Sequence, residues 1–252
     1  MKRISLFFTA AVLAVGCNDN NRKTETETTE TETAAMEDTT ENNNEWIDLF
    51  NGENLNGWKV YNSDADPTQW SVEDGALAFA PSEGERSGTE NIISEEEFTN
   101  FELSLEWKIS EGGNSGIMWG VKESDSLGEP YLTGPEIQVL DNEKHPDAAN
   151  GPIRQAGALY DMVPPSEDAT KPVGEWNETV IRINHKENLG SVTMNGTKIV
   201  EFALHGEEWD KLKENSKFKD WTEFGKYHSG HIALQDHGDK VWYRNIKIRE
   251  LD

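Results

Sequence analysis

Two segments of the chain alternate polar and aliphatic residues with a period of two. They are residues 134–141, with the sequence GPEIQVLD, and residues 229–238, with the sequence SGHIALQDHG. In a β-strand this period places the polar side chains on one face of the sheet and the aliphatic side chains on the other. Acids, amides and imidazoles are costly to bury without partners. We therefore expect a solvated, concave polar face at which a ligand binds.

The rest of the chain consists of short alternating or aromatic runs, separated by turn signals such as Asn51-Gly52, Asp74-Gly75 and Asn195-Gly196. No long amphipathic helical pattern is present. Strands are predicted at residues 70–72, 76–80, 92–94, 101–109, 115–121, 136–140, 157–162, 178–184, 191–194, 197–202, 230–236 and 241–249. So many strands in a chain of this size predict an all-β fold, a sandwich or jelly roll of two antiparallel sheets.

Three segments are predicted to lie outside the strands. Residues 143–154 and 163–175 are expected to form long loops, which in a compact domain are more often functional than not. Residues 205–223 are charged and aromatic. We expect a loop with a helical turn there, and this segment is also a candidate lid.

The N-terminus carries a targeting segment. Lys2 and Arg3 precede a mostly apolar run, residues 4–15, which is short for a membrane span. The run ends at Ala14-Val15-Gly16-Cys17, which resembles a bacterial lipoprotein cleavage site, although an ordinary secretory signal is the alternative. We expect a lipid on Cys17 that anchors the protein to a membrane of the cell envelope. Cys17 is the only cysteine in the sequence, so the folded domain has no disulfide.

Composition divides the remaining chain into two parts. Residues 18–44 are rich in Asn, Thr and Glu and have almost no apolar side chain, which predicts a disordered acidic tether. Residues 45–252 fit one all-β domain. The formal charge of −25 argues against a nucleic-acid partner, because no basic stripe exists to replace the counterions of phosphates. It favours a neutral substrate over an anionic one.

Several motifs follow one another along the predicted domain. They are WIDLFNGENLNGW at 46–58, GNSGI at 113–117, GPEIQVLD at 134–141, GALYD at 157–161, EWN at 175–177, LQDHG at 234–238 and RNI at 244–246. Together they resemble the 3-keto-disaccharide hydrolase family, also described as a 3-keto-glucoside lyase and 2-hydroxy-glucal hydratase domain. The resemblance covers residues 45–252. It implies a concanavalin-A-like (lectin/glucanase) jelly roll and an enzyme that cleaves 3-keto-glycosides.

The chemistry implied by this resemblance differs from ordinary glycoside hydrolysis. A ketone at C3 acidifies the hydrogen on C2, so a general base can remove it, the enolate can expel the C1 substituent, and water can add back. Such a site needs a base, an electrophile for the enolate oxygen and an acid for the leaving group. An ordinary glycosidase needs two carboxylates at a fixed separation, and the spacing of acids along this chain indicates no such pair.

The first alternating segment supplies the leading candidates. Glu136 and Gln138 share one strand face, so Glu136 is a candidate base or metal ligand and Gln138 a candidate substrate-binding residue. A carboxylate satisfied by an arginine or by backbone amides is the alternative for Glu136. Asp141 follows the strand as a further catalytic candidate, unless it caps the turn that begins there.

The second alternating segment supplies imidazoles and an amide. His231, Gln235 and His237 share parity and are predicted to enter one groove, with Asp236 at the strand end as a further substrate-binding candidate. Histidine titrates near neutrality and suits proton transfer, so His237 is a catalytic candidate. A cap of the following hairpin is the alternative for His237.

Other side chains complete the predicted site. Arg154 could stabilise an enolate with its fixed fork of donors, and Tyr160 could donate a proton or stack on a sugar. Asn114 is a candidate for binding sugar hydroxyls, and Trp119 is a candidate substrate-binding residue, although both also fit structural roles. His185 is predicted to be solvated at a hairpin tip. The tryptophans that are the better candidates for reaching the groove are Trp58, Trp70, Trp209 and Trp221, although core packing is the alternative for each.

Two questions stay open from the sequence. Glu136, Asp141 and His237 are oxygen and imidazole ligands that suit a divalent ion, but no diagnostic spacing is present, so a metal is only one option. A carbohydrate-binding module without catalysis is the alternative to an enzyme, because the same fold serves lectins. A scaffold subunit of a surface glycan-uptake complex is a third interpretation.

Overall fold

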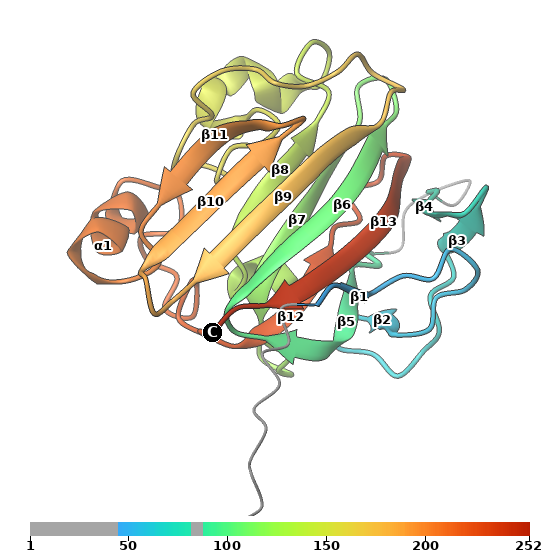
Figure 1. Cartoon of the computed structure of the whole chain (residues 1–252), viewed down its shortest axis with the longest axis horizontal. Coiled ribbons are helices and arrows are strands. Elements are labelled where there is room, and N and C mark those ends of the chain that lie inside the picture. The colour runs from blue at the N-terminus through green and yellow to red at the C-terminus, as the bar shows by residue number, and fades with distance from the viewer. Residues whose placement is uncertain (1–44, 82–87) are drawn as a thin grey trace, which may run out of the picture. The chain divides into compact units, whose positions relative to one another are not determined.

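The computed structural model describes residues 45–81 and 88–252 (Figure 1). Every described residue belongs to one compact unit, Glu41–Asp252. The predicted leader with Cys17 and the predicted tether lie outside the described residues. Within the described part of the chain, no helix is both long enough and apolar enough to cross a membrane.

Two antiparallel sheets form the domain, which confirms the predicted all-β jelly-roll sandwich (Figure 1). Sheet A has the order β11-β10-β9-β6-β13-β4-β3, with β1 paired to β13, and sheet B has the order β2-β5-β12-β7-β8. The strands of sheet A are β1 (Ile47–Asp48), β3 (Trp70–Glu73), β4 (Ala76–Phe79), β6 (Phe101–Ile109), β9 (Asn177–Asn184), β10 (Leu189–Met194), β11 (Thr197–Phe202) and β13 (Val241–Glu250). The strands of sheet B are β2 (Trp58–Val60), β5 (Ile92–Phe98), β7 (Asn114–Val121), β8 (Glu136–Leu140) and β12 (Gly230–Leu234).

The core lies between the two sheets, where large side chains keep their polar atoms satisfied. Trp107 and Tyr243 are fully buried. The indole nitrogen of Trp107 donates to Thr179 Oγ1 at 2.9 Å, and the Tyr243 hydroxyl lies 2.8 Å from Ser115 Oγ. Because Tyr243 belongs to β13 and Ser115 to β7, the second bond ties sheet A to sheet B. Aromatic residues with satisfied polar tips can be buried without the cost of an orphaned donor.

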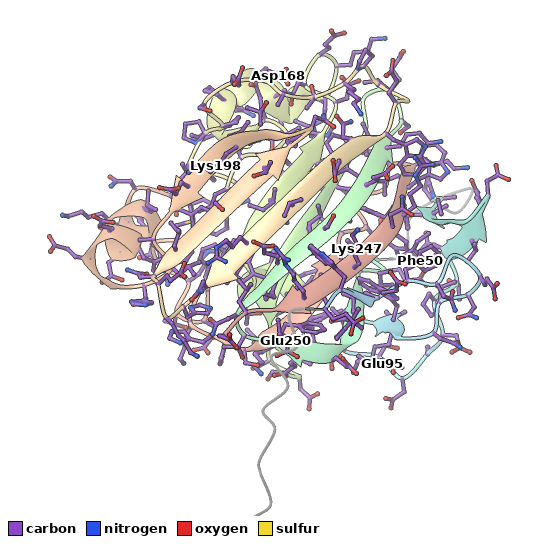
Figure 2. All side chains as sticks on the ribbon, viewed as in Figure 1. Phe50, Glu95, Asp168, Lys198, Lys247 and Glu250 are labelled. Carbon is purple, nitrogen blue, oxygen red and sulfur yellow. The ribbon has the colours of Figure 1, made fainter. Side chains whose placement is uncertain are left out.

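The outward face of sheet A is covered by charged side chains in ion pairs. Figure 2 shows Lys198 and Lys247 on this face, which is turned toward the viewer. Arg249 pairs with Glu102 across β13 and β6, and Lys247 lies over the Trp46 ring at 5.1 Å. The charged groups on this face already have partners on the same face, which is typical of a solvent-exposed sheet face without a ligand. A ligand site is therefore expected on sheet B.

In the described part of the chain, one helix and three short 3₁₀ turns connect the strands: α1 (Gly206–Glu214), η1 (Pro130–Leu132), η2 (Pro146–Asn150) and η3 (Pro152–Arg154). The predicted helical turn in residues 205–223 is confirmed by α1. Glu207 and Glu208 lie in its first turn and Lys211 and Lys213 in its last, as the helix dipole favours. Trp209 packs the helix onto the core.

The predicted strand at residues 157–162 is wrong as a strand. Leu159 makes only isolated bridges to Ile137 and Val163, although Gly157 and Tyr160 donate backbone hydrogen bonds to β8. Asp161 has a φ of 56°, which turns the chain away before a ladder can form. The other predicted strands are present. Those at 101–109, 136–140 and 197–202 have the predicted ends, the rest have shifted ends, and β1 and β2 are additional.

Candidate active site

A cavity of about 240 Å³ opens on the outward face of sheet B. β7 and β8 carry Asn114, Glu136 and Gln138 into it, and the chain just after β12 adds Gln235 and His237. The whole lining consists of Asn114, Tyr131, Glu136, Gln138, Tyr160, Lys217, Phe218, Gln235 and His237. The two alternating segments therefore meet as predicted, because β8 and β12 both flank β7 in the sheet.

Glu136 is a buried carboxylate whose place depends on a glycine. Its side chain is packed so tightly over Gly116 that a Cβ on that glycine would lie 2.2 Å from Glu136 Oε1. Burial raises the pKa of Glu136 to about 7, the positive charge of Lys217 opposes this rise, and Asp147 adds to it. A carboxyl group with that pKa is ionised in part near neutrality and can both take up and return a proton.

Lys217 brings a positive charge to the same cavity. Its Nζ lies 4.2 Å from the centroid of the Tyr160 ring. The residue as a whole is exposed, but its amino group is partly desolvated. Desolvation lowers the pKa of Lys217, and the negative charges of Glu136 and Asp161 only partly offset this effect. Lys217 was missed in the sequence, where only the prediction of a lid at residues 205–223 pointed toward it. Phe218 and Tyr131, which add aromatic walls, were missed as well.

Tyr160 is held by a network of charged residues behind the cavity. Its hydroxyl donates to Asp147 Oδ2 at 2.7 Å, and Arg154 Nη1 donates to Asp147 Oδ1 at 3.1 Å. Arg154 Nε also donates to Asp161 Oδ1, and Asp161 Oδ2 accepts from the Lys217 backbone amide at 2.8 Å. The network thus fixes both Tyr160 and the start of the Lys217–Phe218 segment.

Two charge effects follow from this network. Burial raises the pKa of Asp147, but the bonds from Tyr160, Arg154 and Asn150 outweigh it and hold that pKa below its usual range. Burial and the bond to Asp147 raise the pKa of Tyr160. Arg154 does not line the cavity, so its predicted direct contact with an enolate is corrected to a positioning role.

Two amide side chains in the cavity carry unsatisfied oxygens. Asn114 Oδ1 and Gln235 Oε1 are buried and have no hydrogen-bond partner. Leaving a buried acceptor unpaired costs about 1–3 kcal/mol, and such groups are uncommon in folded proteins. A ligand with hydroxyl donors would satisfy both, which fits the predicted substrate-binding roles of these two residues.

Two predicted site residues instead hold loops in place. Asp141 accepts backbone hydrogen bonds from Gly112, Glu143 and Lys144, so it caps its turn and does not reach the cavity with Glu136. The predicted ligand set of Glu136, Asp141 and His237 is therefore wrong. Asp236 accepts from the backbone amides of Glu90 and Gly238 on the opposite side of the strand.

His231 and the predicted groove tryptophans also lie elsewhere. The ring of His231 is hydrogen-bonded through Nδ1 to the Ser94 carbonyl at 2.8 Å, near Glu97 and away from the cavity. Trp119 points into the core and stacks on Phe202 with 5.7 Å between ring centroids. None of the other four candidate tryptophans lines the cavity. Trp58, Trp70 and Trp209 are buried, as the alternative of core packing has it, and Trp221 packs against Tyr131.

His185 is not solvated as predicted. Its ring stacks on His228 with 4.2 Å between centroids, and both ring nitrogens are buried without a partner. Burial, followed by the nearby charges of His228 and His205, lowers the pKa of His185 to about 4. This cluster is separate from the cavity lining.

A second hollow of about 310 Å³ lies between the loop after β8 and residues 168–175. Its lining combines apolar residues such as Leu140 and Val173 with charged side chains that already cap turns, such as Asp141 and Asp168. The smaller cavity on sheet B contains the Glu136 carboxyl group with its raised pKa and the desolvated Lys217 amino group. It also contains the unsatisfied amide oxygens of Asn114 and Gln235. We therefore place the active site there.

Comparison with known proteins shows the family of this chain. The model of the 3-keto-alpha-glucoside-1,2-lyase-like domain family matches residues 45–249. The chain belongs to this family. A 3-keto-disaccharide hydrolase of Bacteroides thetaiotaomicron is 38% identical across 82% of this chain and 79% of that protein. The resemblance drawn from the sequence motifs is thereby confirmed.

Solved structures show the same fold. A candidate glycosyl hydrolase from Parabacteroides distasonis superposes with a TM-score of 0.76 and 30% identity, over 82% of this chain and 94% of that one. A second candidate glycosyl hydrolase from the same organism gives a TM-score of 0.62 and 29% identity, over 82% and 100%.

Proposed function

We propose that this family member cleaves 3-keto-glycosides by elimination and hydration. The observation that carries the proposal is the pairing of Glu136, with its pKa raised to about 7 mainly by burial, and the Lys217 ammonium in one cavity. The relatives named above support a glycoside-cleaving enzyme, and the name of the Bacteroides relative supports a 3-keto-disaccharide as substrate.

In the first step the Glu136 carboxylate removes the proton on C2 of the sugar. The electrons of the C–H bond form the C2–C3 double bond, and negative charge develops on the C3 oxygen. Lys217 stabilises that charge, because a preorganised cation in a partly dry site is worth more than one in water. Since the C2 proton is acidified by the ketone, an unoxidised glucoside offers Glu136 nothing to remove.

In the second step the enolate re-forms the ketone and expels the C1 substituent, which leaves a C1–C2 double bond. The departing oxygen takes up a proton on the open side of the cavity, where the His237 side chain is 47% exposed. That proton comes from the imidazole or from a water molecule beside it. Water then adds to C1. Glu136, whose carboxyl proton has meanwhile exchanged with water in the cavity, delivers a proton to C2, so the carboxylate is regenerated.

The remaining lining residues fit a sugar. Asn114 and Gln235 offer acceptors to hydroxyl groups, and Gln138 lies beside them on β8. Tyr131 and Phe218 provide aromatic surface for the apolar face of the ring. Within the described chain, Glu136 is the only carboxylate in the cavity lining, which does not suit the paired carboxylates of an ordinary glycosidase.

The experiment compares a 3-keto-glucoside with the matching unoxidised glucoside. We expect cleavage of the keto substrate only, and a loss of about 100-fold or more in kcat for Lys217→Met, as for removal of an oxyanion donor. Lys219→Met is the matched control, because Lys219 is exposed two residues along the same segment. Binding of the keto sugar without turnover would instead identify a carbohydrate-binding module, and cleavage of the plain glucoside would refute the enolate mechanism.

We also propose that Cys17 is lipidated and holds the enzyme at the cell envelope. The support is the sequence alone: a charged start, an apolar run and Ala14-Val15-Gly16-Cys17. The full chain expressed in a bacterium should partition into detergent and incorporate labelled fatty acid, and Cys17→Ser should do neither. Release of unlipidated protein into the medium by both forms would refute the anchor and favour an ordinary secretory signal.

A further inference from the structure

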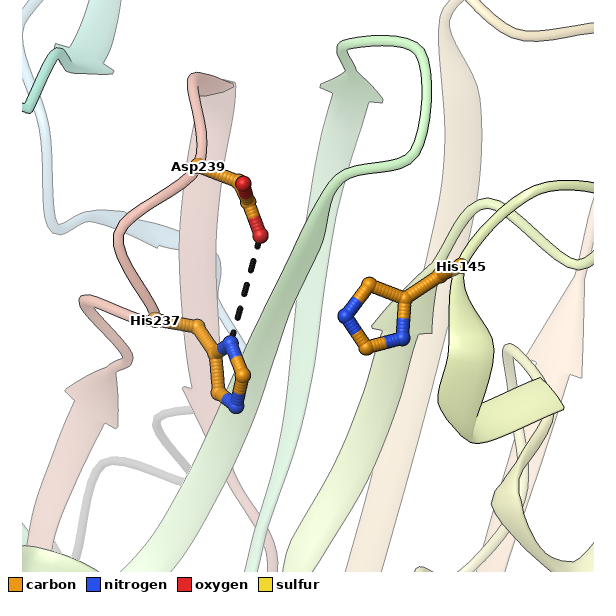
Figure 3. Close-up of side chains that lie close together, drawn as sticks. All are labelled: His145, His237 and Asp239. Atoms are coloured by element: carbon orange, nitrogen blue, oxygen red, sulfur yellow. Dashed lines mark ion pairs between the residues drawn. The ribbon is translucent and has the colours of Figure 1, made fainter. Parts of the chain in front are cut away.

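Two histidines and an aspartate converge beside the active-site cavity. His145 precedes η2, and His237 and Asp239 lie in the loop between β12 and β13 (Figure 3). One ligand atom from each residue lies within 4.8 Å of the others. His237 Nδ1 is 3.9 Å from Asp239 Oδ2, and the two imidazole rings meet edge to face with 5.8 Å between centroids. We propose that these three side chains form a binding site for a divalent transition-metal ion.

Local bonds hold two of the three residues in place. The Asn114 backbone amide donates to Asp239 Oδ2 at 3.2 Å, and the His145 backbone amide donates to the Asp141 carbonyl at 3.0 Å. His237 and Asp239 are separated by Gly238, whose φ of 95° folds the loop so that both side chains face the same point. Ligands positioned by neighbouring hydrogen bonds are typical of metal sites.

The donor set selects the kind of ion. Two imidazole nitrogens and one carboxylate oxygen suit Zn²⁺, Co²⁺, Fe²⁺ or Mn²⁺, and they disfavour Ca²⁺ and Mg²⁺, which prefer oxygen ligands throughout. Three protein ligands leave a position for water, as in catalytic sites. The side chains of His237 and Asp239 are 47% and 37% exposed, so rotation of these side chains can bring ligand atoms that lie within 4.8 Å of one another to bonding positions.

One hydrogen bond opposes binding. His145 Nδ1 accepts from the Asp147 backbone amide at 3.1 Å, so in neutral His145 the proton lies on Nε2, the nitrogen that faces His237 in Figure 3. A metal on Nε2 requires that this proton move to Nδ1, and the bond to Asp147 is then lost. Such a loss weakens binding by about ten- to a hundredfold. We therefore expect micromolar affinity.

The position of the site connects it to the cavity. His237 belongs to both, and Asn114 holds Asp239 with its backbone while its side chain lines the cavity. A metal there would face the open side of the cavity and offer its bound water to the departing oxygen. This role in turnover rests on the proposed function, whereas the binding site itself rests only on the geometry of the three residues.

The test is titration of the chelator-stripped, full-length protein with Co²⁺ and with Zn²⁺, followed by calorimetry and, for Co²⁺, by visible absorption. We expect one equivalent to bind, and His145→Asn and Asp239→Asn each to weaken binding at least about tenfold. Neither residue lines the cavity. His205→Asn is the matched control, because His205 is an exposed histidine of the separate cluster around His185.

Absence of saturable binding would overturn the proposal, as would binding that survives both substitutions or is lost in His205→Asn. Unchanged melting temperatures of the variants would show that lost binding is not lost folding. Turnover of the 3-keto-glucoside is measured on the same samples. Metal binding without any turnover would contradict the proposed function but support the metal site. Full turnover by the metal-free protein would refute a role of the metal in the reaction but not the metal site itself.

Discussion

Replacing Glu136 by Gln is expected to stabilise the domain above neutral pH while it abolishes turnover. Glu136 is buried, and burial raises its pKa from 4.5 to about 7. The folded protein therefore keeps a proton on Glu136 that the unfolded chain has already released. Stability falls as the pH rises through the window between these two values, and it stays at the lower level above pH 7.

The size of the effect follows from the pKa difference. A difference of about 2.5 pKa units corresponds to about 3 kcal/mol, because one unit is about 1.4 kcal/mol. Gln carries no charge, so the gain in free energy of unfolding for Glu136→Gln should be near zero at pH 4.5 and approach about 3 kcal/mol at pH 8. The loss of a counter-charge near Lys217 reduces this gain, so about 1–3 kcal/mol is expected, or roughly 2–12 °C in melting temperature.

The assay is urea unfolding of the wild type and of Glu136→Gln at several pH values from 4.5 to 8, with turnover of the keto substrate measured alongside. Glu96→Gln is the control, because Glu96 is exposed on β5. The gap between wild type and Glu136→Gln should widen with pH, and the control should show no such trend. Parallel curves for wild type and Glu136→Gln would refute the claim that burial raises this pKa.

Three further substitutions test how the cavity is built. Gly116→Ala places a Cβ against the Glu136 carboxylate, so kcat should fall about 100-fold while the protein still folds, and unchanged kcat would contradict the placement. Tyr160→Phe removes the donor to Asp147, so unfolding should become easier by about 1.5 kcal/mol with kcat within about tenfold; a much larger loss would make Tyr160 the acid. Gln235→Leu removes an unpaired buried oxygen, so the melting temperature should hold or rise while KM increases about tenfold, and an unchanged KM would exclude a substrate contact.

The sheets and part of the site could be predicted because both depend on local pattern. Period-two alternation sets which side chains share a strand face, and this predicts that Glu136, Gln138, Gln235 and His237 line one groove, as they do. The same rule explains one error. Asn114 and Trp119 are five positions apart on β7, and an odd offset places them on opposite faces of the sheet, so Trp119 belongs to the core.

Other errors arose because the period-two pattern gives the sheet face of a side chain but not its distance from other side chains. His231 has the parity of Gln235, but four residues of strand separate them by about 13 Å, and a register shift lies between His231 and Ala233. Lys217 reaches Glu136 from a segment about eighty residues later in the chain. Only tertiary packing of the segment after α1 brings them together, and such packing leaves no periodic signal in the sequence.

The central claim is that cleavage begins with removal of the proton on C2. It is tested most directly by comparing kcat/KM for a 3-keto-glucoside with that for the same sugar deuterated at C2. The account predicts a clear primary isotope effect on kcat/KM. It also predicts that the product of a reaction run in D₂O carries one solvent deuteron at C2. Any residual cleavage by Glu136→Gln should show neither. Cleavage at full rate with no isotope effect and no deuterium at C2 would contradict the account.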